Sequence, residues 1–267
     1  MSGTSDFPHE VSSSTPTARV VVLLCTYNEA ENLPELFEQL AEHLPTADIL
    51  VVDDNSPDGT ADWVRSRKNY RETPEPTRLG SSVYLLKRSG KHGLGTATRE
   101  GLQWCLDRSY DFIVHMDADL SHAPQYAPQL LAACLDQPAA RDVAVGSRYV
   151  AGGSLKGLPL HRRWMSRLLN GYATWMLGLP VKDCSGSYRC YRAAALRRLE
   201  LQHLTCPGYG FLEELLVALH RDGARLVEVP IEFGERAGGQ SKLGWSDAWG
   251  AVSVIHRLAF APFNSSK

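Results

Sequence analysis

The chain has 267 residues, of which 43% are hydrophobic and 22% charged, a composition that is ordinary for a globular enzyme. Its 28 basic and 30 acidic residues give a net charge of −2, so the overall charge does not indicate a nucleic-acid partner. None of the six cysteines belongs to a C-x-x-C pair, which argues against a zinc site. Several lie in apolar runs, as buried small hydrophobic residues do, which favours a reducing compartment.

The two ends of the chain differ from its middle. Residues 1–18 are rich in Ser, Thr and Pro and lack the apolar core of a signal peptide, so we expect a disordered tail. We expect residues 19–260 to form the folded domain and residues 261–267 a second tail. No apolar run reaches the roughly 18 residues of a spanning helix, so the protein is expected to lie on a membrane at most.

The first half of the domain alternates between buried strands and amphipathic helices. Aliphatic and β-branched runs predict strands at 19–25, 49–52, 83–86, 112–115 and 143–145. Helical patterns follow Asn28, Thr60, Gly93 and Pro124, while residues 70–81 predict a loop.

The pattern changes after Gly152 and Gly153. Helices are predicted at 162–177 and 210–220, on either side of an irregular segment at 184–191. A strand at 226–233, a polar, flexible loop at 235–242 and a last helix at 245–260 follow. The whole pattern predicts an α/β fold with a mostly parallel, doubly wound sheet and helices on both faces.

Acidic residues follow three of the predicted strands. Glu29, the pair Asp53 and Asp54, and the pair Asp117 and Asp119 therefore fall at the edge of the sheet where ligands gather. A D-x-D after a buried strand suits Mg²⁺ or Mn²⁺, which prefer hard oxygen ligands and usually hold substrate phosphates as well. The alternative is a solvated loop whose acids, together with Ser121, cap the next helix.

Other residues at this edge admit two interpretations. Asp53 and Asp54 suit hydrogen bonds to a base or a ribose, and they also suit a rigid turn. Gly93 and Gly95 would let the backbone approach a phosphate at a helix start, or they form a plain loop. Basic residues able to bind phosphates follow in the second half; they are Arg148, Arg162, Arg163, Arg189, Arg236 and Lys242.

These segments together resemble a known family. The resemblance rests on residues 25–29 (CTYNE), 52–60 (VDDNSPDGT), 117–122 (DADLSH), 146–149 (GSRY), 183–189 (DCSGSYR) and 238–242 (GGQSK). They are similar to the GT-A-fold, family 2 inverting glycosyltransferases, and most similar to the dolichol-phosphate (polyprenol-phosphate) mannose synthases. The resemblance covers residues 19 to about 258 and implies a nucleotide-sugar half at 19–150 and an acceptor half at 151–260.

The resemblance also implies a role for each matching residue. The nucleotide sugar would be held by Thr26, Tyr27, Glu29, Asp53, Asp54, Asp117, Arg236 and Lys242. Asp119 would bind Mg²⁺ or Mn²⁺ beside the diphosphate, with Ser121 as a further oxygen. The acceptor phosphate would be received by Arg148, Arg162, Arg163 and Ser166. Glu214 matches the family without a defined role.

The activity implied is mannose transfer from GDP-mannose to a polyprenyl (dolichyl) monophosphate with inversion, with Asp117, Asp119 and Arg148 in catalytic roles. An acceptor phosphate is largely dianionic at neutral pH and needs no protein base. Two alternatives stay open: a polyprenyl-phosphate glucosyltransferase that uses UDP-glucose, and a non-catalytic nucleotide-sugar-binding subunit.

The place of the protein in the cell follows from the same reasoning. We expect the protein to be cytoplasmic. Any contact with a membrane would be peripheral, at its cytoplasmic face, with or without a partner subunit that anchors the protein. Trp245, Trp249, Val252 and His256 recur at helical spacing and favour an interfacial helix, and the alternative is a helix that packs on the core. No nucleic acid is expected as a partner.

Overall fold

The computed structural model describes residues 18–73, 81–135, 141–157, 159–234 and 245–260, with the backbone alone for residues 245–251. Seven strands form one sheet in the order β3-β2-β1-β4-β7-β5-β8, and β6 pairs with β9 in a small second sheet. The strands are β1 (Val20–Thr26), β2 (Asp48–Asp53), β3 (Val83–Lys87), β4 (Phe112–Asp117), β5 (Val143–Ser147), β6 (Ser154–Leu155), β7 (Arg189–Arg192), β8 (Leu226–Pro230) and β9 (Glu232–Phe233).

The large sheet is parallel except at one strand. β3, β2, β1 and β4 are parallel to one another, and β5 is parallel to β8. β7 runs antiparallel to both β4 and β5, between which it lies. The prediction of a mostly parallel sheet is therefore confirmed. The prediction of an irregular segment at 184–191 is wrong at its end, where β7 begins.

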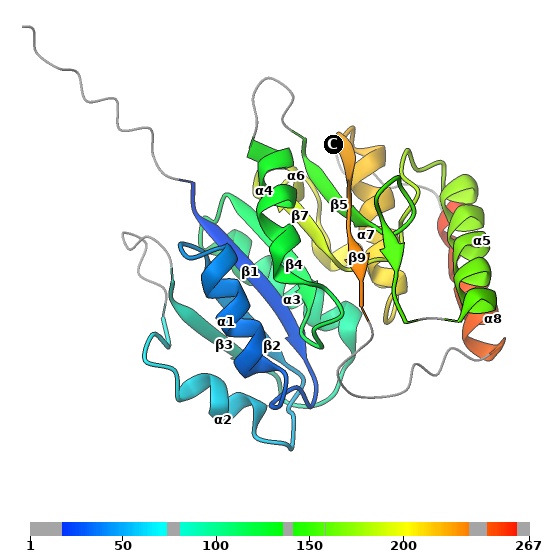
Figure 1. The fold of residues 1–267 in the computed structure, drawn as a ribbon. Helices are drawn as coiled ribbons and strands as arrows, with labels where there is room; N and C mark the ends of the chain where they lie inside the picture. Colours follow the sequence, from blue (N-terminus) through cyan, green and yellow to red (C-terminus); the bar gives the residue numbers. More distant parts are fainter. Residues whose placement is uncertain (1–17, 74–80, 136–140, 158, 235–244, 261–267) are drawn as a thin grey trace, which may run out of the picture.

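Helices cover both faces of this sheet (Figure 1). They are α1 (Leu33–His43), α2 (Thr60–Arg65), α3 (Leu94–Asp107), α4 (Ala127–Leu135), α5 (Leu160–Leu177), α6 (Ala193–Leu196), α7 (Gly210–Arg221) and α8 (Trp245–Phe260), with short 3₁₀ turns at Pro124–Tyr126 and Leu201–His203. The helix expected from Pro124 thus starts with a 3₁₀ turn. The strand expected at 226–233 is divided between the two sheets, as β8 and β9.

Alternation along the strands creates two cores. Val21 and Leu23 of β1 face one core, shared with α3, α5, α7 and α8, whereas Val22 and Leu24 face the other, shared with α1, α2 and α4. Successive strand residues point to opposite faces, and a strand covered on both faces is hydrophobic throughout. The sheet is thus held rigid, and the residues that follow its strands are firmly placed.

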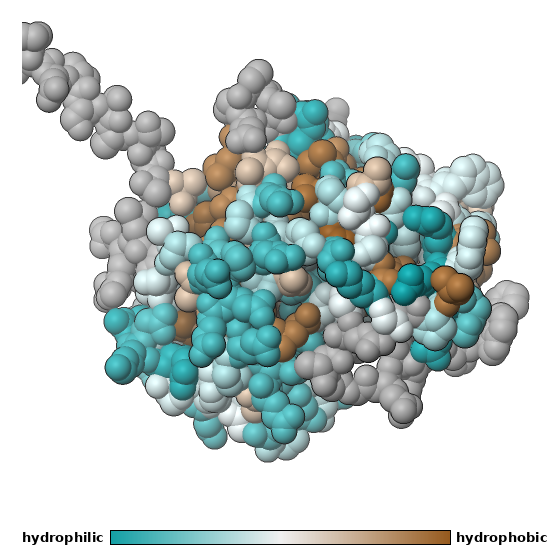
Figure 2. All heavy atoms as spheres, in the orientation of Figure 1, coloured by the Kyte–Doolittle hydropathy of each residue, from teal (hydrophilic) through white to brown (hydrophobic). Residues whose placement is uncertain are grey.

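α5 and α8 pack against each other at one side of the molecule (Figure 1). The hydroxyl of Tyr172 on α5 lies 2.9 Å from Nε2 of His256 on α8, while Ile255 and Leu258 are buried. Of the residues predicted to form an interfacial helix, His256 packs against α5. The side chains of Trp245 and Trp249 lie outside the described residues, so the interfacial helix stays a prediction. Figure 2 shows a mostly hydrophilic surface around α1 and α2, and hydrophobic residues at the surface beside α5.

Candidate active site

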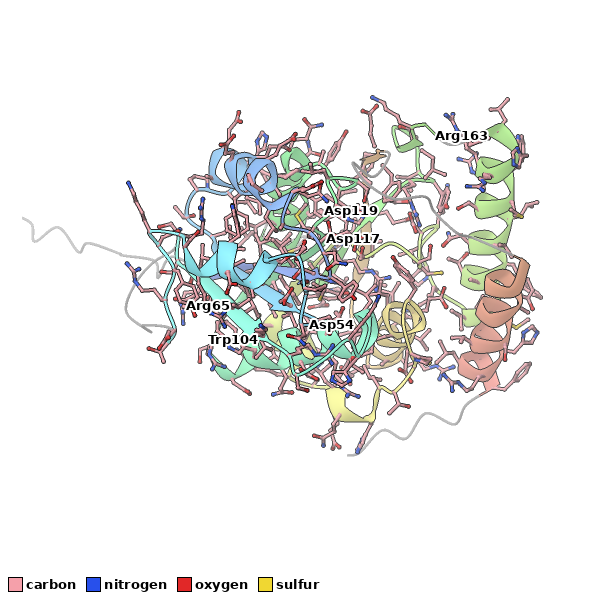
Figure 3. All side chains as sticks on the ribbon, turned by 90° about the horizontal axis from the view of Figure 1, so that it is seen from below. Asp54, Arg65, Trp104, Asp117, Asp119 and Arg163 are labelled. Carbon is pink, nitrogen blue, oxygen red and sulfur yellow. The ribbon has the colours of Figure 1, made fainter. Side chains whose placement is uncertain are left out.

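The predicted acids meet at the carboxyl ends of three neighbouring strands. β1 lies between β2 and β4, and Asp53 pairs in register with Thr26, as Asp117 does with Cys25. Asp119 follows two residues after the end of β4. Asp54, Asp117 and Asp119 lie in the same part of the view from below (Figure 3). Parallel register therefore places the acids on one rim, as the sequence predicts.

Asp117 is held by residues from two segments. Ser187 Oγ donates a hydrogen bond to Asp117 Oδ1 at 2.6 Å, and the Asp117 backbone N–H donates to Nδ1 of His122 at 3.1 Å. Nδ1 of His122 also lies 3.8 Å from Oδ2 of the Asp117 carboxylate. His122 orients the strand end and is not a free base.

Asp119 is fixed by the turn that follows it. Its Oδ1 accepts hydrogen bonds from the backbone N–H of Ser121 at 3.1 Å and from Ser121 Oγ at 2.5 Å. Leu120 has a φ of 63°, a left-handed conformation that closes this turn. Ser121, predicted as a metal ligand, is itself almost fully buried and orients the Asp119 carboxylate.

The donor set at this turn fits a hard divalent cation. Within the described ranges, no group of three or more His, Cys, Asp and Glu side chains stands ready to hold a metal. Asp117 and Asp119 supply only carboxylate oxygens, so an ion here would need further ligands from a phosphorylated substrate. Mg²⁺ typically binds in this way, through one or two carboxylates plus phosphates and water.

Asp53 and Asp54 are engaged with the protein. Asp53 accepts hydrogen bonds from Thr26 Oγ1 at 3.0 Å and from Ser56 Oγ at 2.5 Å. Asp54 accepts a short hydrogen bond from Arg88 and others from the backbone N–H groups of His92 and Gly93, at 3.1 and 2.7 Å. Both acids shape turns at the rim, and direct contact with a nucleoside stays a prediction.

The two glycines at the start of α3, Gly93 and Gly95, have structural roles. The N–H of Gly93 is donated to Asp54. A Cβ on Gly95 would lie 2.9 Å from the carbonyl oxygen of Gly208 and 2.9 Å from Cβ of Phe211. Gly95 therefore allows α3 to approach the start of α7, and contact of this pair with a phosphate stays a prediction.

Tyr27 and Glu29 lie on the loop between β1 and α1. Tyr27 is 36% exposed, and the ammonium of Lys91 lies 3.7 Å from the centre of its ring. Glu29 Oε2 accepts a hydrogen bond from Asn32 Nδ2 at 2.6 Å. An exposed ring at the rim suits stacking on a base, so Tyr27 has the geometry for the predicted role.

Arg148 forms a two-pronged ion pair inside the protein. Its Nε and Nη2 donate to the two carboxylate oxygens of Asp183, each at 2.7 Å, and Nη2 also reaches Ser185 Oγ at 2.8 Å. Asp183 is fully buried. Burial alone would raise the pKa of Asp183, but the charge and hydrogen bonds of Arg148 hold that pKa below its usual value. In the sequence, Asp183 is only the first residue of the DCSGSYR segment, and no role was predicted for it.

The remaining predicted acceptor residues lie on α5. Ser166 Oγ lies 2.6 Å from the hydroxyl of Tyr149, beside Arg148. Arg162 is half-buried, whereas Arg163 is exposed and lies well away from Asp117 and Asp119 in the view from below (Figure 3). Acceptor binding by these residues stays a prediction. Arg236 and Lys242 lie outside the described residues.

Arg189 does not belong among the phosphate-binding residues. It is fully buried, with Nη1 donating to the carbonyl oxygen of Leu212 at 2.6 Å and Nη2 to that of Cys184 at 2.5 Å. The prediction for Arg189 is wrong because it is placed inside the fold by β7. Its neighbour Glu213 is also buried; burial raises the pKa of Glu213 to about 7, against the opposing charge of Arg189.

Glu214 has a structural contact. Its Oε2 accepts a hydrogen bond from the backbone N–H of Cys206 at 2.8 Å. This bond ties the N-terminal part of α7 to the loop before it. No sequence signal separates Glu214 from Glu213, since the two glutamates are adjacent in the sequence.

Residues 21–200 match the model of glycosyl transferase family 2. The chain therefore belongs to this family, and it is a glycosyltransferase with a GT-A-like fold, as the sequence predicts. It is 41% identical over 243 residues to an undecaprenyl-phosphate mannosyltransferase of Micrococcus luteus, covering 91% of this chain and 95% of that protein. It is also 39% identical over 232 residues to the polyprenol monophosphomannose synthase of Mycolicibacterium smegmatis, covering 87% and 83%.

A solved structure shares the fold at lower identity. Glucosyl-3-phosphoglycerate synthase from Mycobacterium tuberculosis, in complex with Mn²⁺, uridine diphosphate and phosphoglyceric acid, aligns with a TM-score of 0.65. The alignment has 17% identity and covers 93% of this chain and 81% of that one. This similarity supports the arrangement of strands and helices and is too distant to transfer a substrate.

Proposed function

We propose that the protein transfers mannose from GDP-mannose to a polyprenyl monophosphate, with inversion and with a divalent metal ion. The observation that carries the proposal is the Asp117 and Asp119 pair, held at the end of β4 in a family 2 chain. Its 41% and 39% identity to two mannosyltransferases of polyprenyl phosphates supports the acceptor and the sugar.

Asp119, with Asp117 beside it, would hold Mg²⁺ or Mn²⁺. The ion supplies positive charge next to the diphosphate of the donor, where negative charge develops as GDP leaves. Ser121 and Ser187 keep the two carboxylates oriented before the donor binds, so little reorganisation is needed. Tyr27 would stack on the guanine, beside the turns that Asp53 and Asp54 shape.

The acceptor provides its own nucleophile. An oxygen of the dianionic phosphate attacks the anomeric carbon from the side opposite GDP, so a new C–O bond forms as the bond to GDP breaks. Attack from the opposite side inverts the anomeric centre. This step requires no proton transfer to the protein. Arg148, Arg162, Arg163 and Ser166 would receive the phosphate.

A polyprenyl phosphate resides in a membrane, so the protein would work at a membrane surface, peripherally and from the cytoplasmic side. Among the described residues, no helix is long and apolar enough to cross a bilayer. α5 carries three arginines and no acidic residue, which favours an anionic surface. An anchoring partner subunit would serve the same purpose.

The test is transfer of labelled mannose from GDP-mannose to a short polyprenyl phosphate, with Mn²⁺ or with a chelator. We expect transfer with the metal, and Asp119→Ala should lower it by at least about 100-fold, since the metal's charge contributes several kcal/mol. Asp62→Ala, an exposed acid on α2, is the matched control and should be fully active. Transfer of glucose from UDP-glucose in preference, or metal-independent transfer, would contradict the proposal.

A further inference from the structure

His122 connects the turn after β4 to β9 and to the residue before β7. It is 2% exposed, and its Nδ1 accepts a hydrogen bond from the backbone N–H of Asp117 at 3.1 Å. The centre of its ring lies 5.0 Å from that of Tyr188 and 5.2 Å from that of Phe233. Tyr188 directly follows Ser187, whose hydroxyl donates to the Asp117 carboxylate. One buried side chain therefore contacts both the strand end that carries Asp117 and aromatic residues from the second half of the chain.

The backbone of β9 is bound to the same turn. His122 and Phe233 form an antiparallel bridge, and the N–H of Gly234 donates to the carbonyl oxygen of Ser121 at 3.0 Å. Ser121 in turn orients Asp119, whose Oδ1 accepts hydrogen bonds from the N–H and the hydroxyl of Ser121. The end of β9 is therefore fixed to the turn that orients the proposed metal ligands.

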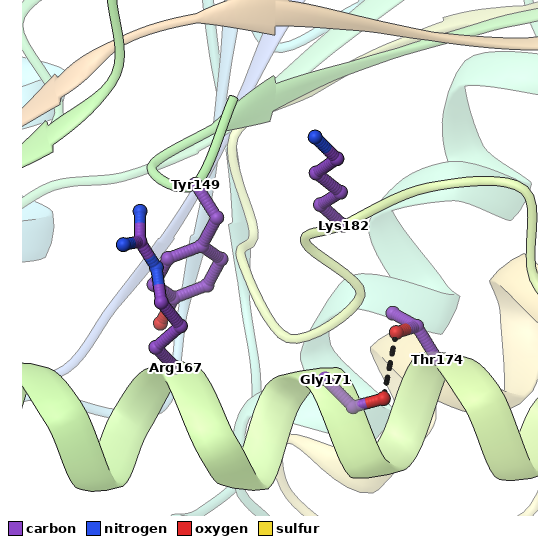
Figure 4. A pocket seen from close by; sticks show the side chains of 5 residues that line it. All are labelled: Tyr149, Arg167, Gly171, Thr174 and Lys182. Carbon is purple, nitrogen blue, oxygen red and sulfur yellow. Dashed lines mark hydrogen bonds between the residues drawn. The ribbon is translucent and has the colours of Figure 1, made fainter. Parts of the chain in front are cut away.

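Phe233 extends this connection to Arg148. The guanidinium carbon of Arg148 lies 5.4 Å from the centre of the Phe233 ring and 5.2 Å from that of Tyr149. A guanidinium over an aromatic ring, within about 6 Å of its centre, is attracted to the ring. The hydroxyl of Tyr149 lies 2.6 Å from Ser166 Oγ, and Tyr149 lines a cavity of about 410 Å³ beside α5 (Figure 4). A row of contacting side chains, formed by His122, Phe233, Arg148 and Tyr149, thus runs from the acidic turn to the residues proposed to receive the acceptor.

The contacts of this row restrict both of its ends. Asp183 holds Nε and Nη2 of Arg148, which keeps the guanidinium beside Phe233. His122 contacts the Phe233 ring edge-on, at an interplanar angle of 70°. A displacement of the turn after β4 would therefore displace Phe233 and reach Arg148. Reacting groups must lie about 3–3.5 Å apart, and a misplacement of about 1 Å can lower the rate about 100-fold, so the alignment of the two ends bears on the rate.

We propose that His122 and Phe233 are positioning residues, which hold the turn of Asp117 and Asp119 and the Arg148 side chain in one fixed arrangement. The donor diphosphate and the acceptor phosphate are thereby aligned. His122 and Phe233 act through the residues that they contact and not on a substrate. This inference rests on the proposed function, because that function assigns the metal ion to Asp119 and the acceptor phosphate to Arg148.

Two variants of His122 separate its hydrogen bond from its ring. His122→Asn keeps an acceptor, since the side-chain oxygen of asparagine can take the place of Nδ1, whereas His122→Phe keeps a ring and loses the acceptor. His122→Phe should raise the dissociation constant of Mn²⁺ in the presence of GDP by at least about 10-fold, a typical effect of removing a residue that orients metal ligands. His122→Asn should leave this constant close to that of the wild type and raise the KM for the acceptor instead. Electron paramagnetic resonance of free Mn²⁺ measures the first constant, and mannose transfer measures the second.

Phe233→Leu tests the other contact of the row. It keeps an apolar side chain but removes the aromatic face, so we expect the KM for a short polyprenyl phosphate to rise about five-fold, the effect of one cation–π contact. The Mn²⁺ affinity should be unchanged, because the backbone bridge to His122 remains. The matched control is Phe37→Leu, since Phe37 of α1 is also half-buried and lies edge-on to the ring of Trp63, with ring centres 5.0 Å apart. This control should alter neither value.

Two results would overturn the inference. The first is a wild-type Mn²⁺ affinity in His122→Phe together with a wild-type acceptor KM in Phe233→Leu. The second is an equal loss of donor and acceptor binding in every variant, Phe37→Leu included, which would make His122 and Phe233 core residues only. If thermal unfolding shows that His122→Phe does not fold, the acceptor KM of Phe233→Leu decides the inference. A wild-type protein that binds Mn²⁺ with GDP but transfers no mannose would contradict the proposed function, while the Mn²⁺ titrations of the His122 variants would still decide this inference.

Discussion

At the residue scale, carboxylates with the same sequence signal have different partners. Asp53 and Asp54 shape turns, Asp183 neutralises Arg148, and Asp117 and Asp119 are oriented by serines. The places of Asp53, Asp54, Asp117 and Asp119 at the rim could be predicted, because each pair follows a buried run. Their partners could not, since Arg88 is 34 residues from Asp54, and Ser187 is 70 residues from Asp117.

The Arg148–Asp183 pair leads to a prediction about stability. Asp183→Asn should lower the free energy of unfolding by about 3 kcal/mol at neutral pH, because it leaves the charge of Arg148 without its buried partner. Urea denaturation would measure this change. Asp62→Asn, which breaks the exposed pair of Asp62 with Arg65, is the control and should change stability little.

The same variant should change how stability depends on pH. The folded pKa of Asp183 lies below its unfolded value, which is about 3.9. The Arg148–Asp183 pair therefore stabilises the folded state fully at a pH above the unfolded pKa of Asp183. This contribution is lost as the pH falls through the folded pKa. The difference between the two proteins should shrink only under acidic conditions, and a constant difference there would contradict this assignment.

At the element scale, the buried strands β1 to β5 and most helices follow the predicted pattern. β7 was missed because it is four residues long, carries arginines at both ends and follows a Ser- and Gly-containing segment. The local sequence does not predict a strand there, and β7 is a strand because it pairs with β4 and β5. β8 and β9 are one apolar run in the sequence, and only the tertiary fold divides them between two sheets.

Two helical glycines should respond oppositely to alanine. Gly95→Ala should destabilise the protein by about 1–3 kcal/mol, since its Cβ would meet backbone at Gly208 and α3 would have to move from α7. Gly171→Ala should stabilise by about 0.5–1 kcal/mol, since its Cβ meets open space and alanine favours a helix. Thermal unfolding of both variants would measure this, and a gain in stability for Gly95→Ala would refute the close-packing explanation.

At the scale of the whole molecule, one sheet with a hydrophobic core on each face carries Asp117 and Asp119 at its rim. α5 and α8 pack against each other at one side of the molecule. A ligand that binds only the folded state stabilises all of it together. Binding of metal and nucleotide at the proposed site should therefore raise the free energy of unfolding of the whole protein.

GDP and Mn²⁺ together should stabilise the protein by more than the sum of the stabilisation by GDP alone and by Mn²⁺ alone. At about 100 times the dissociation constant, a ligand adds about 2.7 kcal/mol, which for a chain of this size raises the Tm by about 5 °C or more. Differential scanning calorimetry with and without EDTA would measure it. Asp119→Asn should remove the joint effect while the protein stays folded; an equal shift by GDP with EDTA would count against a metal at Asp119.

The antiparallel strand has a consequence for where the chain can be cut. β7 comes from the second half of the chain, yet it fills the space between β4 and β5 of the first half. A fragment that ends before β7 would leave two facing strand edges unpaired, and unpaired edges invite aggregation. A cut of the chain before β7 would therefore also disturb β4, the strand that carries Asp117, because β7 pairs with β4 along its length.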